Sequence, residues 1–130
     1  MDLEIKILLV EDNYEDAAVT KRVLSHNKLN NDLVMAASGK EALAVLQNKN
    51  KADLPQLILL DINLPDISGI DLLTRIKKDK NLSNIPVVIL TGSNVNQDIQ
   101  KSYDLGADSY LVKPISNDAL MLVIEKLFYP

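Results

Sequence analysis

A run of four apolar residues that ends on a carboxylate constrains the fold more than any other feature. Leu57 to Leu60 is followed directly by Asp61, and a Leu-Pro-Asp-Ile-Ser-Gly loop then leads into a segment with helical spacing. A strand that is apolar on both faces is typical of a parallel sheet covered by helices. Ligand sites in open α/β sheets lie beyond the carboxyl ends of the strands, so Asp61 is predicted to lie at a functional edge.

The rest of the chain repeats the order of strand and then helix. Strands are predicted over residues 5–10, 32–36, 57–60, 86–90 and 109–112. Helices are predicted to begin at Asn13, Ser38, Ser68, Asn96 and Ser116, with a Ser38–Glu41 capping box in the second and Gly106 capping the fourth. Such alternation favours right-handed crossovers and an α/β fold with a parallel sheet. The 130 residues, which show no internal boundary, are predicted to form one domain (1–130) with no separate output domain.

Composition excludes several functions. No window approaches the 18 or more apolar residues of a membrane span, and there is no cysteine for disulfides or thiolate metal sites. A net charge of −4 argues against binding to nucleic acid, which needs a basic face. The first strand begins almost at once, so no export signal is expected and a cytoplasmic location is predicted.

Polar groups follow three further predicted strands. Glu11-Asp12 follows the first, Thr91-Gly92 the fourth and Lys113-Pro114 the fifth. Each has an ordinary explanation when taken alone, because a strand-end Asp often caps a helix, an acidic pair suits a solvated turn, and a Lys suits a surface. Their joint occurrence at four strand ends, including that of Asp61, indicates a site.

This set of residues, in this order, resembles the receiver domain of two-component response regulators, of the chemotaxis-type single-domain kind. The Leu64–Gly69 loop and Leu105-Gly106-Ala107-Asp108 complete the resemblance, which covers essentially the whole chain. It implies a flavodoxin-like, doubly wound (βα)5 fold with a five-stranded parallel sheet in the order 2-1-3-4-5.

In that strand order Glu11, Asp12 and Asp61 share one cleft. Three carboxylates so close repel one another by energies of about 4 kcal/mol per pair at 4 Å, so the cluster calls for a cation. Oxygen ligands and phosphate chemistry favour Mg²⁺. The resemblance implies that Asp12 and Asp61 bind the metal directly, that Asn63 adds its backbone carbonyl, and that Glu11 acts mostly through water.

The resemblance also implies the chemistry. Asp61 would attack a phosphoryl group and form an acyl phosphate, with Lys113 and Mg²⁺ neutralising the developing charge. The Thr91 hydroxyl and the Gly92 N–H would donate to the phosphoryl oxygens. The donor would be a phosphohistidine on a partner histidine kinase or phosphotransfer protein. Beyond self-directed phosphorylation and slow autodephosphorylation, no enzymatic activity is expected.

A switch is implied as well. Thr91 would move toward the phosphoryl group, and Tyr110 matches the family's switch aromatic, although a strand Tyr is often simply half-buried core. Output would pass through the fourth helix, the fifth strand and the fifth helix to a downstream protein. His26 is expected to be an ordinary surface residue, and the run Lys77-Lys78-Asp79-Lys80 a solvated helix end. The Lys113-Pro114 bond is commonly cis in this family.

Three other functions compete with this interpretation. A phosphatase of the haloacid-dehalogenase type needs a second Asp two residues after the nucleophile, where this chain has Asn63. A flavodoxin needs a hydroxyl-rich phosphate loop where Glu11-Asp12-Asn13 stands. A docking module that works without phosphorylation is the remaining alternative. The loop before Pro55 and the Leu90–Ser93 segment resemble regulators that pair with bacteriophytochrome-type kinases.

The last helix has more apolar residues than one buried face requires. Leu120, Val123, Ile124 and Leu127 can pack on the sheet. Met121 and Phe128 then fall on one flank, with Leu122 and Tyr129 on the other. This surplus, with Leu122, Phe128 and Tyr129 as its main members, predicts an interface, and a symmetric homodimer is the preferred occupant.

Overall fold

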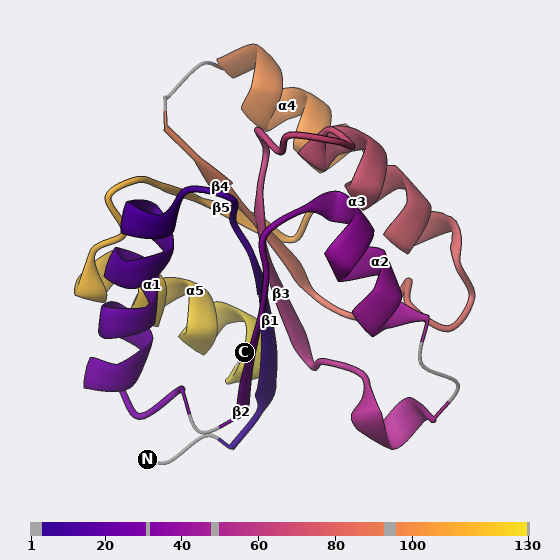
Figure 1. Cartoon of the computed structure of the whole chain (residues 1–130). Coiled ribbons are helices and arrows are strands. Elements are labelled where there is room, and N and C mark those ends of the chain that lie inside the picture. The colour runs from indigo at the N-terminus through magenta and orange to yellow at the C-terminus, as the bar shows by residue number, and fades with distance from the viewer. Residues whose placement is uncertain (1–3, 31, 48–49, 93–95, 130) are drawn as a thin grey trace.

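The computed structural model describes residues 4–30, 32–47, 50–92 and 96–129. Its centre is a parallel sheet with strands β1 (Lys6–Val10), β2 (Asp32–Ala36), β3 (Leu57–Asp61), β4 (Val87–Thr91) and β5 (Ser109–Val112). The helices are α1 (Tyr14–His26), α2 (Gly39–Leu46), α3 (Gly69–Lys78), α4 (Asn96–Asp104) and α5 (Asn117–Phe128), with a short 3₁₀ turn at Lys51–Asp53. Figure 1 shows α1 and α5 on one side of the sheet and α2, α3 and α4 on the other.

The strand order is β2-β1-β3-β4-β5, which confirms the predicted flavodoxin-like topology. All four neighbouring pairs are parallel. β2 and β5 match their predicted ranges, β1 begins one residue later than predicted, and β3 extends by one residue to include Asp61. β4 is shifted by one residue, so that Thr91 is its last residue. The polar loop before Pro55 contains the 3₁₀ turn, which the sequence had not indicated.

The two faces of the sheet bury separate apolar clusters, because successive side chains of a strand point to opposite faces. In β1, Leu8 and Val10 join the cluster under α2 and α3, whereas Ile7 and Leu9 join the cluster under α1 and α5. All five residues of β3 and of β4 are buried. The central strands are therefore fixed by packing on both sides, and their carboxyl ends have well-defined positions.

The predicted caps Asn13 and Ser38 are confirmed, and Ser68 and Ser116 cap their helices in the same way. Asn13, Ser38, Ser68 and Ser116 each accept a hydrogen bond from a backbone N–H in the first turn. In α2 the capping box is displaced by one residue, because the Glu41 carboxylate accepts from the N–H of residue 37 rather than from that of Ser38. Among the described residues, no helix is long and apolar enough to span a membrane.

Lys77 departs from the prediction of a solvated helix end. Its side chain is only 16% exposed. Its Nζ donates to the backbone oxygens of Ser83 and Ile85, at 3.2 and 2.9 Å, and to Oδ2 of Asp108 at 3.2 Å. The same Asp108 oxygen accepts from the N–H of Val87 at 2.8 Å. The prediction was wrong for Lys77, because periodicity cannot reveal acceptors that later segments supply.

Candidate functional site

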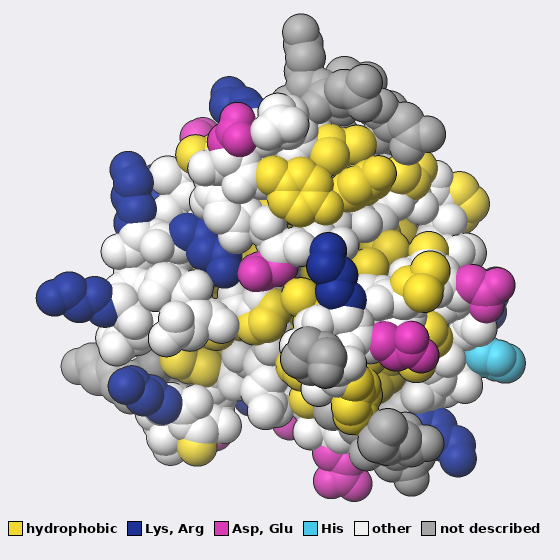
Figure 2. Space-filling model, turned by 180° about the vertical axis from the view of Figure 1, so that it is seen from behind, with side chains coloured by type: hydrophobic (Ala, Val, Ile, Leu, Met, Phe, Trp, Pro, Cys, Tyr) yellow, Lys and Arg dark blue, Asp and Glu magenta, His cyan; other side chains and the backbone are white. Residues whose placement is uncertain are grey.

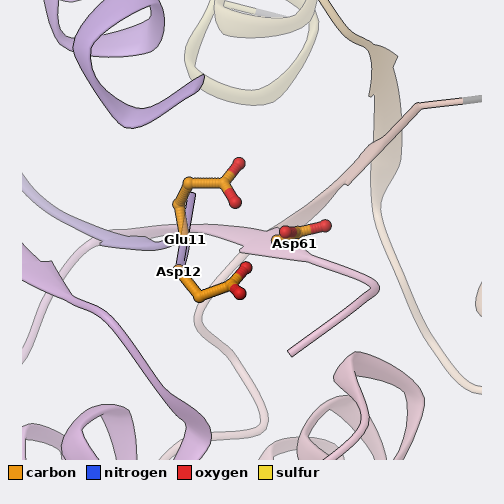
Figure 3. Close-up of side chains that lie close together, drawn as sticks. All are labelled: Glu11, Asp12 and Asp61. Carbon is orange, nitrogen blue, oxygen red and sulfur yellow. The ribbon is translucent and has the colours of Figure 1, made fainter. Parts of the chain in front are cut away.

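The predicted acidic residues lie together at the carboxyl ends of β1 and β3. One carboxylate oxygen from each of Glu11, Asp12 and Asp61 lies within 4.8 Å of the others. Figure 3 shows the three side chains extending to the same side, Glu11 and Asp12 from the end of β1 and Asp61 from the end of β3. Glu11 and Asp61 are buried and Asp12 is exposed. The sequence therefore predicted this cluster correctly, because the strand order makes β1 and β3 neighbours.

A cleft of about 550 Å³ opens above this cluster. Its lining residues come from the ends of β1, β3, β4 and β5 and from the start of α1: Asp12, Asn13, Asp16, Asp61, Asn63, Gly92, Lys113 and Pro114. Most of the residues predicted to form the site thus face one space. Glu11 and Thr91 lie beneath it, 4% and 3% exposed.

Lys113 connects the cluster to the first helix. Its Nζ lies 2.6 Å from Oε1 of Glu11, 3.2 Å from Oδ2 of Asp61 and 3.2 Å from Oδ2 of Asp16. The Lys113–Pro114 peptide bond is cis, as the resemblance implied. Asp16 was missed in the sequence, although it lies in the first turn of a capped helix that begins directly after Glu11-Asp12.

The crowding of carboxylates changes the proton affinity of Glu11. Burial, and then a hydrogen bond with Asp61, raise the pKa of Glu11 from 4.5 to about 7, against the opposing effect of Lys113. Burial alone would lower the pKa of Lys113, but the contact with Glu11 and the charge of Asp61 outweigh it and raise the pKa above its ordinary value. Lys113 therefore stays charged, while Glu11 competes with Asp61 for one ammonium group.

The backbone after β3 aims the Asp61 side chain. Oδ1 of Asp61 accepts from the N–H of Asn63 at 3.1 Å, and Oδ2 faces Lys113. The loop then folds back so closely that a Cβ on Gly69 would lie 2.4 Å from the Asp61 carbonyl oxygen. Only glycine fits there, which explains this member of the Leu64–Gly69 motif.

The same loop is fastened to α2. The Asp66 carboxylate accepts from the N–H groups of Gly39 and Lys40, both at 2.9 Å. These backbone hydrogen bonds at a helix N-terminus lower the pKa of Asp66. The position of Asn63 between Asp61 and this attachment is therefore fixed from both sides.

The residues on β4 and β5 complete the set. The Thr91 carbonyl accepts from the N–H of Lys113 at 2.7 Å, so the ends of the two strands are joined beside the cleft. A Cβ on Gly92 would meet no atom of the described residues within 4 Å, which leaves open space over the cluster. Tyr110 is half-buried and meets Tyr103 edge to face at 6.1 Å between ring centroids. His26 is exposed at the end of α1, remote from these residues, as expected.

The donor set fits a hard divalent cation. It offers carboxylate oxygens from three residues and the backbone of Asn63 nearby, and the chain contains no cysteine. Glu11 Oε1 is buried and, within the described part of the chain, has no hydrogen-bond partner apart from its ion pair with Lys113. A site with more negative charge than one ammonium can neutralise is suited to receive a cation.

Comparison with known proteins identifies the family. The model of the response regulator receiver domain matches residues 7–125 of this chain. The chain therefore belongs to the receiver-domain family of two-component response regulators, whose members typically accept a phosphoryl group and bind a divalent metal.

Individual relatives agree with this assignment. The chain is 39% identical over 110 residues to the response regulator Rcp1 of Synechocystis sp., covering 82% of this chain and 75% of that protein. The Mn²⁺-bound form of Rcp1 matches with a TM-score of 0.78 at 35% identity, covering 96% and 94% of the two chains. The phosphorylated cyanobacterial phytochrome response regulator RcpA matches with a TM-score of 0.79 at 37% identity, covering 98% and 95%. The resemblance to regulators of phytochrome systems is thereby confirmed.

Proposed function

We propose that Asp61 is the sole phosphoryl acceptor of this receiver and that Mg²⁺ is its metal. The observation that carries the proposal is the position of Asp61, which belongs to the acidic cluster and also lies beside the Lys113 ammonium group. Asp12 and Asp61 would hold the ion through carboxylates and Asn63 through its carbonyl, with Glu11 acting through water. The bound ion would supply charge neutralisation at the phosphoryl oxygens.

Each of several protein groups would then have its own role in the phosphoryl transfer. An oxygen of the Asp61 carboxylate forms the new bond to phosphorus while the bond from phosphorus to the donor nitrogen breaks, and the imidazole leaves with that electron pair. Lys113, already directed at Oδ2 of Asp61, neutralises the charge of the transferred group. The Thr91 hydroxyl and the Gly92 N–H donate to its oxygens from the end of β4. Later attack by water releases phosphate slowly and restores the carboxylate.

The conformational output would begin at Thr91 and Tyr110. In the register of β4 and β5, Ile89 pairs with Tyr110, and Thr91 lies two residues further along β4. Movement of Thr91 toward the phosphoryl group would free space that the half-buried Tyr110 ring can enter, with loss of its edge contact to Tyr103. The changed face would comprise α4, β5 and α5, and would contact a downstream protein.

The donor partner would be a histidine kinase or phosphotransfer protein, and the relation to phytochrome response regulators favours a phytochrome-type kinase. A cytoplasmic location belongs to the same proposal, because such a kinase makes phosphohistidine from intracellular ATP. Action without an output domain or nucleic-acid contact stays a prediction from the sequence.

Phosphorylation with acetyl phosphate tests the assignment. With Mg²⁺, wild-type protein should gain one phosphate by mass spectrometry, and Asp61→Asn should gain none. Phosphorylation of Asp61→Asn at the wild-type level would rule out Asp61 as the acceptor. Failure of the wild-type protein to react, with a kinase as well as with acetyl phosphate, would favour a docking module that works without phosphorylation.

We further propose that α5 forms a symmetric homodimer. Leu122 is 68% exposed and Tyr129 is 40% exposed, whereas Phe128 packs partly against the core. The surplus apolar surface is therefore narrower than predicted, because Phe128 is half-buried. Hydrophobic side chains also reach the surface at several places on the face shown in Figure 2. C₂ pairs are the commonest assembly that covers such a surface.

Sedimentation of wild type and Leu122→Glu, before and after phosphorylation, tests the dimer. Wild type should dimerise in at least one state at micromolar concentration, and Leu122→Glu should remain monomeric in both. Glu125→Ala, on the same helix and exposed, serves as a control that should dimerise. A wild-type protein that stays monomeric in both states would exclude the dimer.

A further inference from the structure

We infer that Asp16 is a specificity-determining residue that disfavours small anionic phosphodonors relative to the less charged phosphohistidine of a partner. The inference rests on the proposed phosphoryl transfer to Asp61. It is carried by the position of Asp16 at the rim of the cleft, where its Oδ2 lies as close to Lys113 Nζ, at 3.2 Å, as Oδ2 of Asp61 does.

Asp16 is held in place by its own helix. Its N–H donates to the side chain of the N-cap Asn13 at 2.9 Å, so the first turn of α1 is fixed beside the cleft. Its carboxylate accepts from Lys113 and is 43% exposed, unlike the buried Glu11 and Asp61. A donor entering the cleft from solvent therefore meets the Asp16 charge before it reaches Asp61.

A count of charges shows why this one group matters. The carboxylates of Glu11, Asp12 and Asp61 are balanced by the ammonium of Lys113 together with a divalent cation. Asp16 is a fourth carboxylate in the same cleft, and with it the loaded site carries a net negative charge. Repulsion of an incoming anion grows with the charge of that anion, so Asp16 slows a dianionic donor more than a donor with less charge.

Asp16 also holds Lys113, which is directed at the phosphoryl group that all donors share. Loss of this contact should therefore change the rates with all donors in the same direction. The ratio of rates between two donors of different charge therefore isolates the electrostatic contribution of Asp16.

The experiment compares acetyl phosphate, a dianion at neutral pH, with phosphoramidate, a zwitterion whose ammonium group offsets part of its charge. Rates of Asp61 phosphorylation are measured at low ionic strength and saturating Mg²⁺ for wild type, Asp16→Asn, Asp16→Glu and Glu15→Gln. Glu15 is exposed, is the next residue in the chain and undergoes the same change of charge, so it is the matched control. Removal of the Asp16 charge should also weaken Mg²⁺ binding, so calorimetry is used to choose a Mg²⁺ concentration that saturates each of the four proteins.

Asp16→Asn should raise the ratio of the acetyl phosphate rate to the phosphoramidate rate roughly threefold to tenfold. Asp16→Glu and Glu15→Gln should keep the wild-type ratio, and high salt should shrink the difference between Asp16→Asn and wild type. If wild type and control are both phosphorylated on Asp61 but Asp16→Asn has the wild-type ratio, the role of Asp16 is overturned and the proposed function still stands. Absence of Asp61 phosphorylation in wild type with either donor would overturn both this inference and the proposed function.

Discussion

Two lysines lie at opposite ends of the sheet, and their ammonium groups have different sets of partners. Lys77, near the amino ends of β4 and β5, has one carboxylate partner and two backbone carbonyls. Lys113, at the carboxyl ends, has three carboxylate partners and no second cation beside it among the described residues. The first cluster is electrically balanced, and the second has an excess of negative charge.

The difference separates stability from function. A buried ammonium that is paired and fully hydrogen-bonded stabilises the fold, and breaking such a pair is costly. An excess of buried carboxylates destabilises the fold until a cation arrives. We therefore expect removal of a charge at the Lys77 end to lower stability, and removal of a carboxylate at the Lys113 end to raise stability without metal while impairing metal binding or phosphorylation.

The largest expected effect on stability concerns the backbone at the Lys113 end of the sheet. Gly69→Ala places a Cβ against backbone atoms of residues 61 and 62 that cannot move aside, and should lower the free energy of unfolding by about 3 kcal/mol. Gly92→Ala makes the same substitution in open space and should change it by less than about 0.5 kcal/mol. Urea unfolding of the two variants checks this. Equal losses of stability in the two variants would show that the close approach of Gly69 to the backbone of residues 61 and 62 does not limit the side chain at this position.

A smaller effect follows from Glu11. Because its pKa is raised from 4.5 to about 7 in the folded protein, the folded state binds a proton more tightly than the unfolded chain. The resulting stability is fully present below pH 4.5 and is lost as pH rises through about 7. Without metal, wild type should lose on the order of 1 kcal/mol per pH unit more than Glu11→Gln across this window.

Urea unfolding in a chelating buffer, at several pH values from 4.5 to 8, measures the two slopes. Adding Mg²⁺ should reduce the loss at the alkaline end, because the ion binds the deprotonated cluster. Parallel slopes for wild type and Glu11→Gln would contradict the assigned proton affinity.

The smallest effect concerns Asp12, which is the exposed member of the cluster. Asp12→Ala should lose Mg²⁺-dependent phosphorylation and yet stay folded, with a gain in stability of up to about 1 kcal/mol without metal as repulsion is relieved. Thermal unfolding with and without Mg²⁺ checks this, since only wild type should be stabilised by the ion. An Asp12→Ala protein that is phosphorylated as fast as wild type would contradict the metal assignment.

The sequence predicted the fold and most of the site because both follow from local patterns. Strand ends mark Asp61, Thr91 and Lys113, and the strand order of the resembled family brings them together. Asp16 and Lys77 were not found, because each acquires its role from a distant partner: Asp16 from Lys113, 97 residues later, and Lys77 from Asp108, 31 residues later. Long-range ion pairs leave no periodic signal in the chain.

The most direct test makes the same type of substitution, Asp to Asn, at each end of the sheet. Asp61→Asn removes one of the excess carboxylates at the Lys113 end, and Asp108→Asn removes the only carboxylate that contacts Lys77 in the described part of the chain. Measured by urea unfolding without metal, Asp61→Asn should gain about 1 kcal/mol and Asp108→Asn should lose about 2 kcal/mol. Only Asp61→Asn should lose phosphorylation. A change of the same sign in both variants would contradict the division between a stabilising and a functional end.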